Sequence, residues 1–213
     1  MVHIGSRALP SLSLLSNAVL KSREGAEVLA SNLWQSKPLA VLILRRPGCV
    51  LCRDEAQRLW ALKPEFDKLG VELICVVHEW IQREIDAFSP SYWPGPLYHD
   101  ASKAFYGALN GGTPLRGSPL GLLMPWSAVW ARIRAAQKNV KEHNLAGEGL
   151  IMGGAMVLQR AQAGSGSGNG GDGGSGGAGG RVAWMHVESE LGLVAEPQEV
   201  LEAARRVAAE GAR

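Results

Sequence analysis

Residues 37–69 read KPLAVLILRRPGCVLCRDEAQRLWALKPEFDKL, and this stretch decides the fold of the whole chain. Its first part, Leu39–Leu44, is an unbroken apolar run that is too short for a helix and is flanked by prolines. Such a run predicts a buried strand. Because the apolarity is continuous rather than alternating, the strand should be covered on both faces, as in a parallel or mixed α/β sheet.

An amphipathic helix should follow a tight turn and start at Cys52. One face is apolar because apolar residues recur at intervals of three and four residues: Cys52, Ala56, Leu59, Leu62, Phe66 and Leu69. Asp54 and Glu55 would then sit in the first turn, where the helix dipole favours acidic side chains. Gly70 is typical of a helix end, and Pro64 should kink or split the helix.

Length and charge exclude several classes of protein. The chain has 213 residues, which suits one domain with additional peripheral segments. Its net charge is +2, and it has no basic cluster. The charge gives no electrostatic footprint for nucleic acid or a membrane surface, and the longest apolar candidate, residues 119–129, is too short to span a bilayer. Three cysteines do not make a secreted disulfide scaffold. These features favour a soluble intracellular protein, cytoplasmic rather than secreted.

Residues 1–36 form an N-terminal extension to the domain predicted over residues 37–213. Residues 2–15 are Ser-rich and lack acidic side chains, so an organellar targeting peptide within residues 1–30 is the alternative to a cytoplasmic protein. Residues 18–29 predict two short strands around Glu24 and Gly25, which together form a hairpin.

The remaining patterns predict an open α/β sheet of thioredoxin type, a mixed sheet flanked by helices. Within residues 120–140 we expect a helix with Trp126, Trp130 and Ile133 directed inward. Residues 164–180 are almost wholly Gly and small polar residues, and predict a mobile loop inserted between the last two strands. The predicted strands are 71–77, 97–99, 150–158 and 181–187, and the other predicted helices are 80–88, 102–109 and 197–209.

The spacing Cys49-x-x-Cys52 at a strand-to-helix junction points to thiol–disulfide or peroxide chemistry. A helix N-terminus offers free N–H groups and a positive dipole end, which lower the pKa of a thiol. Arg45, Arg46 and Arg53 supply positive charge nearby in sequence. An attacking thiolate would form a mixed disulfide or a sulfenic acid, and the second cysteine would resolve it.

Two other interpretations of the cysteine pair are a zinc site and an inert turn. Cys75 and His78 would complete a four-ligand set, but positions three apart on a strand point to opposite faces, so zinc is rejected. Cys75 should instead pack as a small buried hydrophobe. Glu148, between two glycines, is a candidate neighbour of the redox turn, with loop solvation as its alternative role.

The segments LILRRPGCVLCRDEAQRLWALKPEFDKLGVELICVVHE, PLYHDASKAFYGALN and NLAGEGLIMGGAMVL resemble the peroxiredoxin-like 2 family of AhpC/TSA-type antioxidant proteins. The resemblance covers most of the chain from Trp34 onward. It implies a thioredoxin fold and a cytoplasmic antioxidant oxidoreductase whose redox-active centre is Cys49 and Cys52, able to form a disulfide. No bound cofactor is expected; an external reductant, thioredoxin, glutathione or an NADPH-linked system, would supply electrons.

The substrate and the order of attack stay open at this level. A peroxide, an endoperoxide or a protein disulfide would suit the pair, and one branch of the family is a prostamide/prostaglandin F synthase. Cys49 is favoured as the attacking thiol in disulfide exchange. For peroxide reduction the family alignment favours Cys52, with Cys49 at the position where typical peroxiredoxins carry Thr. A non-catalytic interaction protein with a vestigial cysteine pair is the alternative class.

Overall fold

The computed structural model describes residues 9–124, 126–160 and 180–211. Within them the strands form one mixed seven-stranded sheet in the order β2-β1-β5-β4-β3-β6-β7. Strands β3, β4 and β5 run parallel, and β6 and β7 pair antiparallel beyond β3. The strands are β1 Val19–Ser22, β2 Glu27–Leu29, β3 Leu39–Leu44, β4 Glu72–Val77, β5 Leu97–His99, β6 Gly154–Arg160 and β7 Gly180–Val187.

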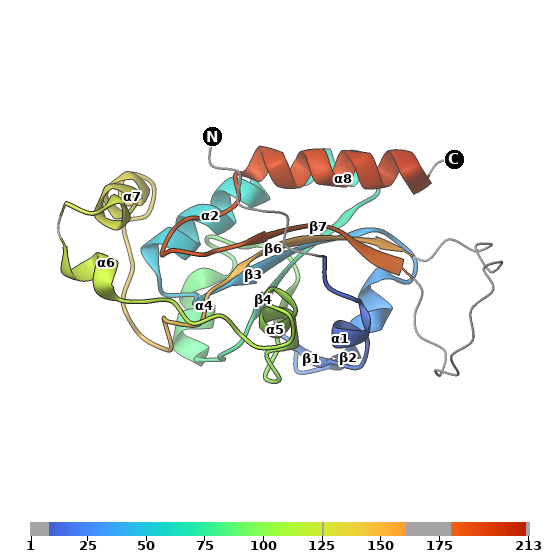
Figure 1. Ribbon diagram of the computed structural model, residues 1–213, viewed down its shortest axis with the longest axis horizontal. Coiled ribbons are helices and arrows are strands. Elements are labelled where there is room, and N and C mark those ends of the chain that lie inside the picture. The colour runs from blue at the N-terminus through green and yellow to red at the C-terminus, as the bar shows by residue number, and fades with distance from the viewer. Residues whose placement is uncertain (1–8, 125, 161–179, 212–213) are drawn as a thin grey trace.

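Helices cover both faces of the sheet, with α2 and α8 on one side and α1 and α5 on the other (Figure 1). No helix among the described residues is long and apolar enough to cross a membrane. The helices are α1 Ser13–Ser16, the 3-10 helix η1 Ala30–Trp34, α2 Val50–Trp60, α3 Lys63–Lys68, α4 Gln82–Phe88, α5 Ala104–Ala108, α6 Leu120–Leu123, α7 Ala128–Ala136 and α8 Pro197–Gly211.

Strand β3 lies at the centre of the sheet and is buried along its whole length, as its continuous apolarity predicts. Its side chains alternate between two cores because successive residues of a strand point to opposite faces. Leu42 packs in the core beneath α2 and α8, and Ile43 packs in the core beneath α1 and α5. Both faces therefore need apolar residues, which confirms the predicted strand and explains its unbroken pattern.

Helix α2 begins two residues earlier than the sequence predicts. Cys49, not Cys52, is the N-cap: its backbone is extended (φ −76°, ψ 133°) and its carbonyl accepts the first helical hydrogen bond, from Arg53 N, at 2.9 Å. The first-turn position expected for Asp54 and Glu55 is therefore wrong. No Ser, Thr, Asp or Asn marks this N-cap, so the usual capping signal was absent. The split at Pro64 is confirmed, because α3 starts with this proline in its first turn.

The predicted N-terminal hairpin is confirmed, with β1 and β2 joined through Gly25 at φ +90°. Strand β1 also pairs with β5, so the hairpin extends the main sheet. Residues 1–8 of the proposed targeting segment lie outside the described residues. So does the predicted Gly-rich loop over 164–180, apart from Gly180, where β7 begins.

Two predicted elements differ from the structure. Strand β6 begins at Gly154 instead of residue 150, because Ile151 and Met152 bond to the segment at Leu115 and Arg116. The region 120–140 holds two short helices, α6 and α7, rather than one.

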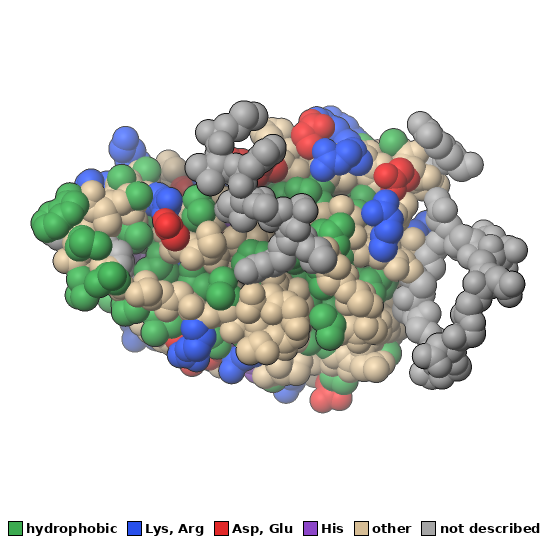
Figure 2. Space-filling view, viewed as in Figure 1, with side chains coloured by type: hydrophobic (Ala, Val, Ile, Leu, Met, Phe, Trp, Pro, Cys, Tyr) green, Lys and Arg blue, Asp and Glu red, His purple; other side chains and the backbone are tan. Residues whose placement is uncertain are grey.

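Trp126 lies between α6 and α7 and is 82% exposed, so its predicted inward position is wrong. Val129 and Ala136 make the buried side of α7. Figure 2 shows hydrophobic side chains gathered at the end of the molecule formed by α6 and α7. The exposed apolar residues at this end are Leu120, Leu123, Met124 and Trp126.

Candidate active site

The cysteine pair lies where β3 ends and α2 begins, at the carboxyl edge of the parallel strands. Cys49 caps α2 and Cys52 sits in its first turn. Both are free thiols, and their residues are 5% and 4% exposed, so exposure does not separate the attacking cysteine from its neighbour. Both cysteines lie at the N-terminal end of α2, where the positive end of the helix dipole favours a thiolate.

The turn before the helix is held by hydrogen bonds to two of its backbone carbonyls, and the Asn144 side chain packs closely against Gly48. Asn144 N donates to the Gly48 carbonyl at 2.8 Å, and a side chain on Gly48 would meet Asn144 Oδ1 at 2.3 Å. Arg53 Nε donates to the Pro47 carbonyl at 2.8 Å. These bonds fix the backbone conformation that presents Cys49 at the start of α2.

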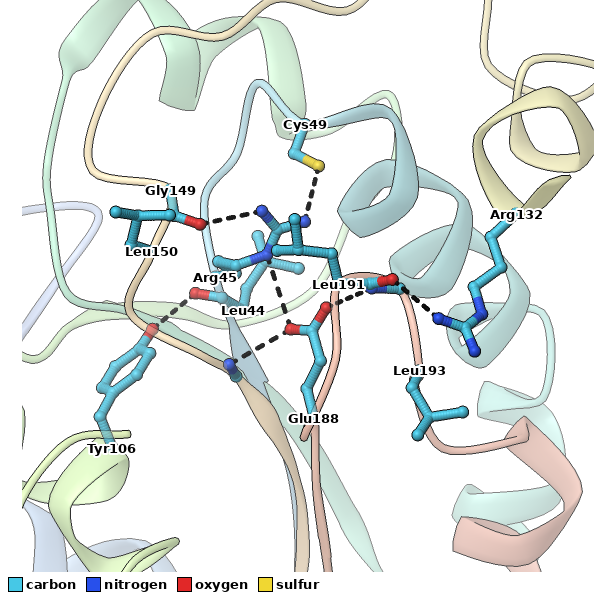
Figure 3. Close-up of polar contacts among 12 residues, drawn as sticks. Leu44, Arg45, Cys49, Tyr106, Arg132, Gly149, Leu150, Glu188, Leu191 and Leu193 are labelled. Atoms are coloured by element: carbon cyan, nitrogen blue, oxygen red, sulfur yellow. Dashed lines mark hydrogen bonds and ion pairs between the residues drawn. The ribbon is translucent and has the colours of Figure 1, made fainter. Parts of the chain in front are cut away.

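Arg45 is the residue that contacts the Cys49 sulfur directly. It is 5% exposed, and its guanidinium makes three contacts, which Figure 3 shows together. Nη2 donates to Cys49 Sγ at 3.1 Å, Nη1 donates to the Gly149 carbonyl at 3.0 Å, and Nε lies 3.5 Å from Glu188 Oε2. The expected role of Arg45 in stabilising a thiolate has a direct geometric basis here.

The pKa values of the two thiols are shifted in opposite directions. Hydrogen bonding from the Cys52 thiol lowers the pKa of Cys49; burial opposes this, while Arg45, the Cys52 backbone N–H and Arg46 lower it further. The pKa of Cys52 is raised, first because its proton is held in the bond to Cys49 and then because it is buried. These two directions, together with the Arg45 contact, favour Cys49 over Cys52 as the thiolate of the pair.

The other predicted site residues are placed differently. Arg46 donates to the Leu145 carbonyl at 2.9 Å and reaches the thiol only through its charge. Arg53 is buried, lies 3.7 Å from Glu84 and stacks over Tyr92, so it braces the turn. The Glu148 carboxylate pairs with Arg116 at 3.0 Å and accepts from Leu150 N. Only the backbone next to Glu148 enters the site, through the Gly149 carbonyl.

Cys75 and His78 diverge as predicted. Cys75 is fully buried in the core beneath α2, whereas His78 packs edge-on against Tyr106 of α5 with ring centroids 4.9 Å apart. Tyr106 belongs to the opposite core and donates its hydroxyl to the Leu44 carbonyl at 2.6 Å. Within the described residues no group of three or more His, Cys, Asp or Glu side chains could hold a metal ion.

Two buried carboxyl groups complete the site, and sequence reasoning missed both. Glu188 follows β7 directly and is 4% exposed; no local pattern in the sequence singles it out. Glu55 is 8% exposed and stands three residues after Cys52, on the face that also carries Ala56 and Leu59. The helical spacing could have identified Glu55 as an acidic residue on a buried face.

Comparisons with known proteins identify the family. A family model described as AhpC/TSA antioxidant enzyme matches residues 58–165, which follow the cysteine pair. Peroxiredoxin-like 2A of Xenopus laevis is 37% identical over 184 residues, covering 86% of this chain and 70% of the relative. Peroxiredoxin-like 2A of Danio rerio is 36% identical over 202 residues, covering 94% and 84%. The chain belongs to the peroxiredoxin-like 2 family of AhpC/TSA-type antioxidant proteins.

Solved peroxiredoxin structures share the fold of this peroxiredoxin-like 2 chain. Peroxiredoxin Q of Xanthomonas campestris superimposes with a TM-score of 0.55 at 17% identity, covering 94% of this chain and 98% of that one. Peroxidoxin BcpB of Mycobacterium tuberculosis gives a TM-score of 0.52 at 13% identity, with coverages of 94% and 99%. The predicted thioredoxin-like fold is confirmed by this likeness, which at such identity speaks for the fold alone.

In this peroxiredoxin-like 2 chain, the buried Glu55 carboxyl should lower the free energy of unfolding at neutral pH. Burial raises the pKa of Glu55 well above its ordinary value of 4.5, and the nearby Glu188 charge raises it further. Below pH 4.5 the folded and unfolded states are both protonated, so no cost arises. As pH rises above 4.5, the unfolded chain loses this proton first and the folded state loses relative stability. We expect Glu55→Gln to raise the free energy of unfolding at pH 7 by roughly 1–2 kcal/mol.

Urea unfolding at pH 4 and pH 7 checks this expectation for Glu55. The gain from Glu55→Gln should shrink toward zero at the lower pH. Glu27→Gln, at an exposed position in β2, is the matched control and should change neither value. A loss of stability at pH 7 in Glu55→Gln would contradict the argument, because it would mean that an ionised Glu55 is stabilised by a partner.

Proposed function

We propose that the chain is a thiol-dependent oxidoreductase that reduces a peroxide or endoperoxide through Cys49 and Cys52. One observation carries the proposal: the Arg45 guanidinium donates to Cys49 Sγ at 3.1 Å at the N-terminus of α2. A cation and a helix N-terminus on the same sulfur favour a thiolate at neutral pH, and the thiolate is the nucleophilic form. Membership of the antioxidant family supports the same chemistry.

The proposed reaction has two steps on the protein. The Cys49 thiolate attacks one peroxide oxygen; the S–O bond forms, the O–O bond breaks, and the leaving alkoxide takes up a proton. With a hydroperoxide Cys49 is then a sulfenic acid, and with an endoperoxide it is a sulfenate ester of the opened substrate. The Cys52 sulfur attacks Cys49 Sγ and displaces the oxygen substituent, which leaves with the Cys52 thiol proton as water in the first case and as the product alcohol in the second. The product is a Cys49–Cys52 disulfide, and the peroxide has gained two electrons.

An external reductant must restore the reduced pair. Thioredoxin or two molecules of glutathione would supply two electrons and two protons and leave as a disulfide, and an NADPH-linked system would supply the two electrons through oxidation of NADPH to NADP⁺. No bound cofactor is needed for this cycle. The three cysteines are free in the structure, which suits a reducing compartment such as the cytoplasm.

A panel assay of the reduced protein tests the proposal. Hydrogen peroxide, a cyclic organic endoperoxide and a protein disulfide are each offered in equimolar amount. Loss of free thiol is then measured, followed by its recovery with dithiothreitol. We expect two thiols lost per oxidant consumed and full recovery. Preference for the endoperoxide would favour a prostamide/prostaglandin F synthase-like reductase, and preference for the protein disulfide would favour disulfide exchange.

The double variant Cys49→Ser, Cys52→Ser is the control, and Cys75→Ala matches it as a buried cysteine outside the pair. The double variant should consume no oxidant, while Cys75→Ala should behave as the wild type. Full reductase activity in the double variant would end the proposal.

A second candidate is a non-catalytic interaction protein that retains the fold. The observation in its favour is that both sulfurs of the pair are nearly enclosed, at 5% and 4% exposure. Alkylation of the thiols as a function of pH separates the two functions. Reaction of Cys49 well below the unperturbed cysteine pKa of about 8.5 supports catalysis, and two unreactive thiols support the interaction protein.

A further inference from the structure

Glu188 is a fully enclosed carboxylate whose hydrogen bonds fix it in one position. It is 4% exposed and stands directly after β7, on the far side of Arg45 from the cysteine. Oε1 accepts from Gly192 N at 2.7 Å, and Oε2 accepts from Gly153 N at 3.3 Å. The Glu188 backbone N donates to the Gly153 carbonyl at 3.0 Å, which ties the residue to the start of β6.

The position that receives Glu188 is equally constrained. A side chain on Gly153 would meet the Ile43 carbonyl of β3 at 2.2 Å, so only glycine lets β6, β3 and Glu188 approach this closely. The carboxylate is therefore bound by rigid backbone on β6 and on the loop after β7. A carboxylate held in this way is preorganised, so its contact with Arg45 requires no further ordering of the Glu188 side chain.

Arg45 has Glu188 as its anionic partner in the site. The guanidinium has three anchors: an ion pair with Glu188 at Nε, which makes no hydrogen bond, and hydrogen bonds to the Gly149 carbonyl from Nη1 and to Cys49 Sγ from Nη2. Of the two anchors other than Cys49, the Gly149 carbonyl is neutral and the Glu188 carboxylate carries a charge. We propose that Glu188 is a positioning residue that holds the Arg45 guanidinium so that Nη2 faces the Cys49 sulfur.

The proposal rests on the proposed function, in which Cys49 is the attacking thiolate. It predicts that removal of Glu188 shifts the pKa of Cys49 in the direction opposite to that expected from the Glu188 charge alone. A carboxylate near a thiol, acting alone, disfavours the thiolate, so its removal would lower the pKa of Cys49. If Glu188 works through Arg45, its removal lets the guanidinium move off the sulfur and the pKa rises. The other charged or titratable groups around Cys49 are Arg46, Glu55 and Cys52; loss of the Glu188 charge also lowers the pKa of Glu55 and of Cys52, which Glu188 raises.

The experiment measures the alkylation of Cys49 against pH in the full-length protein, with mass spectrometry assigning the modified cysteine. Glu188→Gln keeps an oxygen acceptor for the Gly192 N–H and loses the charge. We expect the pH midpoint of Cys49 alkylation in this variant to rise by about one pH unit. The matched control is Glu190→Gln, an exposed carboxylate on the same loop that pairs with Arg132 at 3.5 Å, and its midpoint should not move.

Two further variants keep the test decisive. Glu188→Asp retains the charge but shortens the reach to Arg45, so a smaller rise is expected; it also serves if Glu188→Gln fails to fold. In an Arg45→Met background, Glu188→Gln should no longer raise the midpoint. A midpoint that falls or stays constant in Glu188→Gln, or an Asp variant equal to wild type, would overturn the positioning role.

This readout separates the two proposals because alkylation needs no substrate. If wild-type protein reduced none of the panel oxidants, the proposed function would fail while the Cys49 midpoint could still rise in Glu188→Gln. If turnover were normal and the midpoint did not rise, the function would stand and the role of Glu188 would fail.

Discussion

Cys49→Ser should abolish peroxide turnover, lowering the rate by roughly 1,000-fold or more, whereas Cys52→Ser should still complete one turnover. The reason is the division of charge between the two sulfurs. Cys49 has the lowered pKa and the contact with Arg45, while the pKa of Cys52 is raised by its bond to Cys49 and by burial. Without Cys49, burial and the Glu188 charge still raise the pKa of Cys52, so the remaining thiol should be a poor nucleophile at neutral pH.

Single-turnover measurements distinguish the two variants. In Cys52→Ser, Cys49 should be oxidised to a sulfenic acid that cannot be resolved, and a 1,3-dione probe should trap one equivalent on Cys49. In Cys49→Ser, no trapped species should form at neutral pH. Cys75→Ala is the matched control and should retain full turnover, since Cys75 is buried in β4 away from Arg45. The reverse pattern, with trapping only on Cys52, would make Cys52 the attacking residue, as the family alignment favours for peroxides.

The sequence was sufficient for the centre of the fold because local pattern and burial agree there. Leu39–Leu44 needs apolar residues at every position, since β3 has a core on each face, and this requirement is visible in the sequence alone. The same holds for α8, predicted as a helix over residues 197–209, in which the buried Val200, Ala204 and Val207 recur at intervals of three and four. Trp126 was misplaced because a single helical phase was carried across the break between α6 and α7, although Pro125 marks this break in the sequence.

The candidate site was predicted only in part, for a different physical reason. The cysteine pair and Arg45 belong to one short segment, so their proximity follows from local geometry. Glu188 approaches Arg45 only because β6 and β7 pair antiparallel beside β3. Such a contact depends on tertiary structure and leaves no trace in residue spacing. Arg53 illustrates the converse: it is adjacent to Cys52 in sequence, yet its side chain turns to the Pro47 carbonyl and Glu84.

Arg45→Met should have the largest effect on stability of the substitutions considered. Arg45 and Glu188 form an ion pair whose side chains are 4% and 5% exposed. Removing one partner of a buried pair leaves the other charge without compensation, which typically costs about 3–5 kcal/mol. Cys49 also loses the cation on its sulfur, so its pKa should rise and its alkylation at pH 7 should slow. Arg46→Met is the matched control: Arg46 does not contact the sulfur, so its smaller charge effect should shift the Cys49 pKa less.

A double variant separates these two consequences of losing Arg45. Arg45→Met, Glu188→Gln removes both charges of the buried ion pair, and the amide oxygen introduced by Glu188→Gln can still accept from the Gly192 N–H, so most of the lost stability should return. The reactivity of Cys49 should not return, because no cation faces the sulfur. Urea unfolding gives the first quantity and the pH midpoint of Cys49 alkylation gives the second. If stability and thiol reactivity were restored together, the Arg45 contact would be incidental to the thiolate, and the helix N-terminus with Cys52 would have to account for it alone.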